Sequence, residues 1–216
     1  NPAPRGPTVT VDGARLQLCP AAGPPCAAFA LRRPLDPNAV VRVSADLSTV
    51  AIGAHATARI YDRATGKLRA AIAGWPTEIS DGRASSIGDL TLVGHDRVVV
   101  WAHATPVSAE GRVFTLDGRP LGRLGPPGFA VLAETPAWPL ADGAWAFKGE
   151  AATLVVYTPR DGAQEIYDLR PLTTPSNWAP DVVALGRLEQ LLGRPGRPVQ
   201  AYIREHAPLW AKPDMR

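Results

Sequence analysis

The chain has 216 residues, of which 45% are apolar and 20% are charged, a balance that is ordinary for a globular protein and excludes global disorder. Its net charge of +3 comes from scattered arginines that form no run longer than Arg32–Arg33, which argues against nucleic-acid binding because that function requires clustered charge. No window approaches 18 consecutive apolar residues, so the sequence predicts no transmembrane segment.

Proline and glycine are frequent, with 23 and 20 residues, and they are spread along the chain at turn-like positions. This distribution is typical of many short strands joined by tight turns. The sequence therefore predicts an all-β domain over residues 9–172, preceded by an extended arm over residues 1–8 and followed by a helical tail over residues 173–216.

The first strands are expected after the proline-rich lead-in NPAPRGPT. In TVTVDGARLQLC, residues 8–19, apolar and polar residues alternate on both sides of Asp12–Gly13, which predicts a hairpin on a type I′ turn. A short apolar segment, residues 27–31, and a proline-marked turn in LDPN, residues 35–38, follow.

Cys19 and Cys26 are the two cysteines of the chain and flank the loop CPAAGPPC. They have neither a Cys-x-x-Cys nor a metal-ligand spacing, so we expect a disulfide, with two buried free thiols as the alternative. The disulfide, together with a chain that begins at Asn1 without methionine, leads us to expect a secreted protein, periplasmic or extracellular.

Residues 40–73 form the unit that organises the rest of the prediction. Four runs of about five alternating residues are separated by turns at Asp46, at Ala54–His55–Ala56 and at Ala64–Thr65–Gly66. So small a sheet cannot bury both of its faces alone, so the unit must recur. Residues 89–124 and 137–172 repeat the pattern, with a polar bend expected over residues 108–111.

Alignment of the three units on their third turn brings three glycines into register, Gly66, Gly118 and Gly162. Alignment on the first turn pairs three aspartates, Asp46, Asp96 and Asp142. Gly13 lies 53 residues before Gly66, so we assign the N-terminal hairpin to the last two strands of an earlier unit. Repeats of 40 to 50 residues with four strands each are typical of propeller blades.

The segment SADLSTVAIGAHATARIYDRATGKLRAAI resembles a blade of the WD-repeat and YVTN-type β-propellers. A turn of small residues and Asp precedes the second strand, and the pair Tyr61–Asp62 ends the third strand before Ala64–Thr65–Gly66–Lys67. The resemblance covers residues 40–172, one blade well and two loosely. It implies a fold and carries almost no information about activity.

The predicted fold is therefore propeller-like, with three to four four-stranded antiparallel blades in a small or incomplete ring. A sandwich or a curved open sheet is the alternative. Because exposed sheet edges invite pairing, an incomplete ring predicts a homo-oligomer or a complex with another protein.

The C-terminal tail has a different pattern. Asp181 is expected to cap a helix with apolar residues at 3.6-residue spacing that ends at Gly193, and GRPGRP, residues 193–198, is expected to be a linker. A second short helix is expected from Pro198 to Trp210. This tail packs on the sheets or docks on a partner.

Candidate catalytic and metal-binding residues do not form a recognisable motif. The histidines, His55, His95, His103 and His206, have no ligand spacing, and no serine lies in a nucleophile context, so we predict no metal, no cofactor and no catalytic residue. Five aspartates are predicted to stabilise turns, namely Asp46, Asp96, Asp117, Asp142 and Asp161.

Four of the six tryptophans neighbour a proline or a loop, where a large rigid ring can contact protein or sugar: Trp75, Trp138, Trp178 and Trp210. They are the predicted partner-binding residues. We expect a non-catalytic binding or assembly module, a subunit of an exported or envelope-associated complex. The alternatives are a lyase or glycoside hydrolase that uses carboxylates with His55 or His95, and a carbohydrate-binding propeller.

Overall fold

The computed structural model describes residues 7–76, 82–103, 108–127, 129–132, 137–140, 143–149, 153–168 and 197–198. Within these ranges the chain is all-β, as predicted, and contains no helix. The chain forms two compact units, Asn1–Gly122 and Arg123–Arg216, and each is considered by itself. The predicted helices of the tail lie outside the described residues, except for Pro198, the first residue of the second predicted helix, which lies in a strand.

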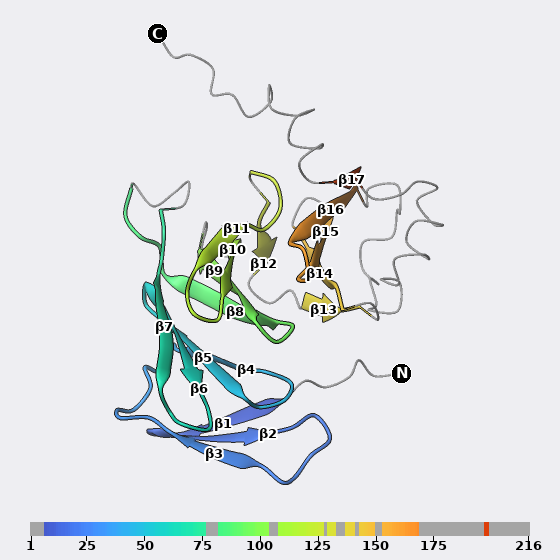
Figure 1. Cartoon of the computed structure of the whole chain (residues 1–216). Helices are drawn as coiled ribbons and strands as arrows, with labels where there is room; N and C mark the ends of the chain where they lie inside the picture. Colours follow the sequence, from blue (N-terminus) through green and yellow to red (C-terminus); the bar gives the residue numbers. More distant parts are fainter. Residues whose placement is uncertain are drawn as a thin grey trace. The chain divides into compact units, whose positions relative to one another are not determined.

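Consecutive strands form four antiparallel sheets (Figure 1). In chain order the strands are β1 (Thr8–Asp12), β2 (Arg15–Cys19), β3 (Ala27–Ala30), β4 (Val40–Val43), β5 (Thr49–Ala54), β6 (Thr57–Asp62), β7 (Leu68–Ala73), β8 (Ile87–Val93), β9 (Arg97–His103), β10 (Ser108–Thr115), β11 (Pro120–Arg123), β12 (Val131–Leu132), β13 (Ala137–Pro139), β14 (Trp145–Lys148), β15 (Thr153–Thr158), β16 (Ala163–Asp168) and β17 (Arg197–Pro198).

The first sheet has the order β1-β2-β3, so the predicted hairpin is confirmed and gains a third strand. Its turn is Gly13–Ala14, closed by the pair Asp12 and Arg15. Gly13 has φ +57° whereas Ala14 has no positive φ, which is the pattern of a type II′ turn. The predicted type I′ turn is therefore wrong, because it requires positive φ at both residues. β1 also begins at Thr8, within the predicted arm.

The second sheet, β4-β5-β6-β7, is the predicted organising unit and is confirmed. Its second strand, β5, is buried along almost its whole length, because the first sheet covers one of its faces and the third sheet covers the other. Val50 and Ile52 face the first sheet, whereas Ala51, between them, faces the third sheet. Strand periodicity thus places alternate residues of one strand in two different cores.

The third sheet has the order β11-β10-β9-β8, which confirms residues 89–124 as an antiparallel sheet like that of residues 40–73. The predicted polar bend over residues 108–111 is wrong, because these residues begin β10 and pair with β9. Gly111 fits there because the Trp101 ring of β9 lies over it; an added Cβ would come within 2.5 Å of that ring.

The second unit contains a sheet of order β13-β14-β15-β16, as predicted, with β17 added beyond β16. Arg197 and Pro198 of β17 pair with β16, so this end of GRPGRP is a strand and not a linker. Gln164 of β16 accepts a hydrogen bond from the Gly125 N–H at 2.7 Å and donates one to the Arg123 carbonyl at 3.0 Å.

The predicted alignment of the third turns is confirmed. Gly66, Gly118 and Gly162 each have positive φ and follow the third strand of their sheet. Each backbone N–H donates a hydrogen bond to a carbonyl three or four residues earlier in the turn. Among the aligned first turns, Asp46 and Asp96 lie between the first two strands of their sheets, and Asp142 lies outside the described residues.

Candidate interaction site at an open strand edge

The turn between β1 and β2 corresponds to the turn between β5 and β6. Each is a two-residue turn that begins with a residue of positive φ, Gly13 at +57° and His55 at +50°. With the turns superposed, Leu16 and Leu18 of the first sheet take the places of Ala58 and Ile60. The first pair faces the second sheet, and the second pair faces the third.

Equivalent backbone hydrogen bonds form after the last strand of each of the two sheets. The N–H of Leu31, after β3, donates to the carbonyl oxygen of Ala14 at 2.8 Å. The N–H of Gly74, after β7, donates to the carbonyl oxygen of Ala56 in the same way. Thus β1, β2 and β3 correspond to β5, β6 and β7. The prediction that the hairpin supplies the last two strands of a unit is wrong; the sheet has the second, third and fourth strands.

Among the described residues, the first sheet therefore has no counterpart of β4, the first strand of the second sheet. No described strand pairs with the open side of β1. The Leu31 to Ala14 bond shows that even-numbered residues of β2 point their backbone groups toward β3. Backbone N–H and C=O groups point to opposite sides at successive residues of a strand, so the odd-numbered residues of β2 form their backbone hydrogen bonds with Thr8, Thr10 and Asp12 of β1. The N–H and C=O groups of Val9 and Val11 consequently face the open side.

The exposure of side chains also differs between β1 and β5. β1 is exposed at four of its five residues, and Val11 is 48% exposed, whereas Val50 of β5 is fully buried. On the face away from the second sheet, Thr8 and Thr10 take the places of Val50 and Ile52. Threonine at these positions gives the first sheet a polar outer face.

Two of the other edge strands, β3 and β11, carry features that block strand pairing. β3 has four residues and is followed by Arg32–Arg33–Pro34. β11 also has four residues, begins with Pro120 and contains Gly122. Short strands, charge and proline are the usual protection of an edge, and β1 has none of them between Thr8 and Val11.

The predicted disulfide between Cys19 and Cys26 is present. It closes the loop between β2 and β3, which corresponds to the loop from Asp62 to Lys67 in the second sheet. There the turn is fixed by Asp62, which accepts hydrogen bonds from the N–H and hydroxyl of Thr65 at 2.8 and 2.7 Å. The bond from the Thr65 hydroxyl, the largest cause, lowers the pKa of Asp62.

The structure removes Trp75 from the predicted partner-binding residues. It is only 5% exposed and packs in the core between the second and third sheets, with its ring 6.1 Å from that of Phe114. The Arg112 guanidinium lies over the Trp75 ring, 4.8 Å from its centre, in a cation–π contact. The side chain of Trp138, and all of Trp178 and Trp210, lie outside the described part of the chain, so their role stays a prediction.

Two histidines of the first unit, His55 and His95, lie in turns between strands. His55 is mostly exposed, and its Nε2 lies 3.2 Å from Asp36, whose carboxylate also accepts from the Asn38 N–H in the LDPN turn. His95 lies near enough to Asp46 to favour its charged form. No group of three His, Cys, Asp or Glu side chains able to hold a metal occurs within the described ranges.

Asp46 stabilises the first turn of the second sheet, as predicted. Its carboxylate accepts hydrogen bonds from the hydroxyls of Ser44 and Ser48 at 2.6 and 2.9 Å and from the Ser48 N–H at 3.0 Å. These bonds, above all that from Ser44, lower the pKa of Asp46 from 3.8 to about 2. Leu47 in this turn has φ +56°, a conformation usually taken by glycine.

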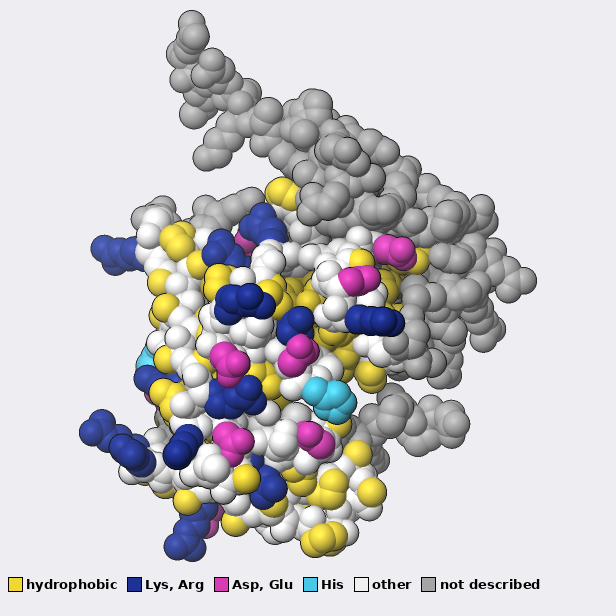
Figure 2. All heavy atoms as spheres, in the orientation of Figure 1, with side chains coloured by type: hydrophobic (Ala, Val, Ile, Leu, Met, Phe, Trp, Pro, Cys, Tyr) yellow, Lys and Arg dark blue, Asp and Glu magenta, His cyan; other side chains and the backbone are white. Residues whose placement is uncertain are grey.

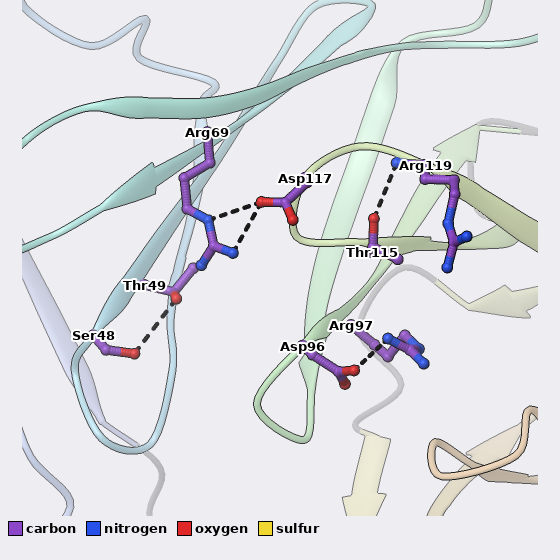
Figure 3. Close-up of polar contacts among 8 residues, drawn as sticks. All are labelled: Ser48, Thr49, Arg69, Asp96, Arg97, Thr115, Asp117 and Arg119. Carbon is purple, nitrogen blue, oxygen red and sulfur yellow. Dashed lines mark hydrogen bonds and ion pairs between the residues drawn. The ribbon is translucent and has the colours of Figure 1, made fainter.

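Asp161 also behaves as predicted, since it accepts from the Ala163 N–H at 2.9 Å. Asp117 differs: it accepts from Nε and a terminal nitrogen of Arg69 at 3.2 and 3.0 Å, linking the second and third sheets (Figure 3). Asp96 pairs with the neighbouring Arg97. Sequence reasoning missed these roles because a turn pattern does not show which basic side chain of another sheet lies opposite.

Basic and acidic side chains are intermingled on the face of the molecule drawn in Figure 2, and hydrophobic side chains are also exposed at the lower end, over the N-terminal sheet. The large hydrophobic residues that are exposed among the described residues are Val11, Leu68 and Leu121. All three lie on edge strands, Val11 on β1, Leu68 on β7 and Leu121 on β11.

No protein-family model and no curated protein matches the chain. Among solved structures, the chain is similar to the structure of U3-55K, with 13% identity over 75% of this chain and 48% of that one and a TM-score of 0.44. It is also similar to a chain in the crystal structure of the mitotic checkpoint complex, with 13% identity over 75% of this chain and 62% of that one and a TM-score of 0.36. The chain thus spans about half to two thirds of the length of these structures.

Proposed function

We propose that this chain is a non-catalytic binding module that assembles with protein through the open edge of β1. The observation that carries the proposal is that no described strand pairs with the side of β1 toward which the backbone groups of Val9 and Val11 point. Unpaired strand edges bind an added strand through main-chain hydrogen bonds, and the alternating side chains supply specificity.

The disulfide supports export as part of the same proposal. A bond between Cys19 and Cys26 persists in oxidising compartments and is rare in the cytosol, so we assign the module to the periplasm or the extracellular space. Among the described residues no helix is long and apolar enough to span a membrane. Alkylation of free thiols before lysis of the native source tests this assignment: it predicts unlabelled cysteines, and complete labelling of both would contradict it.

The binding proposal is tested by a charged substitution on the edge. Val11→Lys adds a charge at the proposed edge, whereas Leu68→Lys, the matched control, adds the same charge at a similarly exposed position of a different edge strand, β7. Solution mass is measured for both variants alone and after incubation with native extract. We expect Val11→Lys to lose association that Leu68→Lys keeps. Equal behaviour of the wild type and both variants would contradict the proposal.

A further inference from the structure

We infer that the strand that occupies the open edge is β1 of a second copy of this chain, paired antiparallel about a two-fold axis at Thr10. This inference rests on the proposed function and names its partner. It follows from three properties of residues 8–12: the direction of their backbone groups, the register that satisfies them, and the side chains that the register brings together.

The backbone directions select one register. Outward groups belong to Val9 and Val11, so a partner strand must present its own outward groups opposite these two residues. When Val9 lies opposite Val11 of the copy, both outward residues of both strands exchange hydrogen bonds. Registers shifted by two residues place Pro7, which has no N–H, or Gly13 of the turn opposite one valine, and lose part of this pairing.

The side chains fit the same register. Val9 packs on the apolar core of the first sheet, and Val11 lies on the same face of β1. Each valine therefore meets the other valine of the copy, and β-branched cross-strand pairs stabilise sheets. On the polar side, Thr10 meets its own copy at the axis and Thr8 lies opposite Asp12. A hydroxyl therefore meets the carboxylate, and no two like charges are directly opposed.

The chemistry of β1 favours a second copy over an unrelated strand. Residues 8–12, Thr-Val-Thr-Val-Asp, become Asp-Val-Thr-Val-Thr when reversed, so the three central residues are the same in either direction and the segment is complementary to itself when antiparallel. A two-fold interface requires this self-complementarity, because the same patch serves both subunits. The result is a continuous six-stranded sheet with the order β3-β2-β1-β1-β2-β3.

The register makes a prediction that only a two-fold pairing at Thr10 satisfies. Directly opposed residues that do not exchange hydrogen bonds have Cα atoms about 4.5 Å apart, within the range of a disulfide. Thr10→Cys should form an intermolecular disulfide in mild oxidant. Gln17→Cys is the matched control, because Gln17 lies beside Thr10 on β2, is also exposed, and is two strand spacings farther from its own copy.

The experiment combines this cross-link with the solution mass of the full chain over a range of concentrations. We expect the wild type to reach twice the 22.9 kDa of one chain, Val11→Lys to remain at one chain, and Thr10→Cys to cross-link at least tenfold faster than Gln17→Cys. Equal thermal stability of the wild type and Val11→Lys at concentrations where both are monomeric shows that the variant is folded.

Three results would overturn the inference, each differently. A wild type that stays at one chain, with Val11→Lys less stable, shows that the chain fills its own edge. A monomeric wild type that retains a protein from native extract, which Val11→Lys loses, leaves the proposed function standing and removes the second copy. A dimer in which Thr10→Cys cross-links no faster than Gln17→Cys has another interface.

Discussion

The first and second sheets share three corresponding strands, but one face of β1 is exposed in the first sheet whereas the corresponding face of β5 is buried in the second. At corresponding positions of β1 and β5, the face toward the preceding sheet has Thr8 and Thr10 in one case and Val50 and Ile52 in the other. The threonines are exposed and the aliphatic residues are buried against the first sheet. Two side chains thus distinguish an exposed sheet face from one that packs on a neighbouring sheet.

The opposite face of the two strands shows a second difference. Val9 and Val11 of β1 correspond to Ala51 and Gly53 of β5. An added Cβ at Gly53 would lie 2.8 Å from the Ile87 side chain, so the second sheet needs glycine where the next sheet approaches closely. Val11 has no comparable neighbour and remains 48% exposed. Close packing against the third sheet requires small residues in β5, whereas β1 has valine at the corresponding positions.

Exchange of the face-determining residues is expected to have the largest effect. Ile52→Thr buries a hydroxyl and removes apolar volume between the first two sheets, which should lower the free energy of unfolding by about 2–3 kcal/mol. Thr10→Ile at the corresponding exposed position should change it by less than about 0.5 kcal/mol. Urea denaturation measures both. Equal losses would show that the two faces are not different environments.

Loss of the disulfide is expected to have the next largest effect, because it belongs to the first sheet alone. Cys19→Ser combined with Cys26→Ser opens a loop with a sequence separation of 7, which should cost about 2 kcal/mol through the greater entropy of the unfolded chain. Thermal denaturation of this variant and of the oxidised wild type provides the comparison. An unchanged unfolding temperature would mean that the cross-link contributes nothing to the first sheet.

The acid response should come from the second sheet, which has the first turn that the N-terminal sheet lacks. The pKa of Asp46 is lowered to about 2, so its charged form contributes stability above its usual value near 3.8, and this contribution is lost as the pH falls toward 2. Asp46→Asn should lower stability by about 1 kcal/mol at pH 7 and by almost nothing near pH 2. Chemical denaturation at both pH values measures the difference; the same loss at both would contradict the role of the charge.

The ion pair between the second and third sheets is expected to contribute least. Arg69 and Asp117 are both accessible to solvent, and such pairs are usually worth about 0.2–1 kcal/mol. A double-mutant cycle with Arg69→Ala and Asp117→Ala should give a coupling energy at the lower end of this range, decreasing in high salt. A larger coupling would mean that polar contacts, and not the apolar cores, decide which sheets pack together.

Much of the fold could be predicted because its signals are local. Alternating residues identify β5, β6 and β7, and Gly66, Gly118 and Gly162 place the third turns in register. The order of the N-terminal strands could not be predicted in the same way. Its decisive equivalence joins Gly13 to His55, and the positive φ of His55 is imposed by its turn and not announced by its residue type.

The candidate site was less predictable than the fold. Trp75 was expected at a partner surface because Pro76 follows it, but it lies where the second sheet meets Phe114 and Arg112 of the third. Val9 and Val11 gave no signal beyond strand alternation. Their importance depends on which neighbouring strand is missing, a property of the whole sheet and not of the segment.

The most direct test of the open edge is amide hydrogen exchange at β1 over a range of protein concentrations. In dilute protein, the N–H groups of Val9 and Val11 should exchange fast while that of Thr10, bonded to β2, is protected. At high concentration both valine amides should become protected as the edges pair. Protection of Val9 and Val11 at the lowest concentration, where the chain is a monomer, would contradict the account, because the edge would then already be filled.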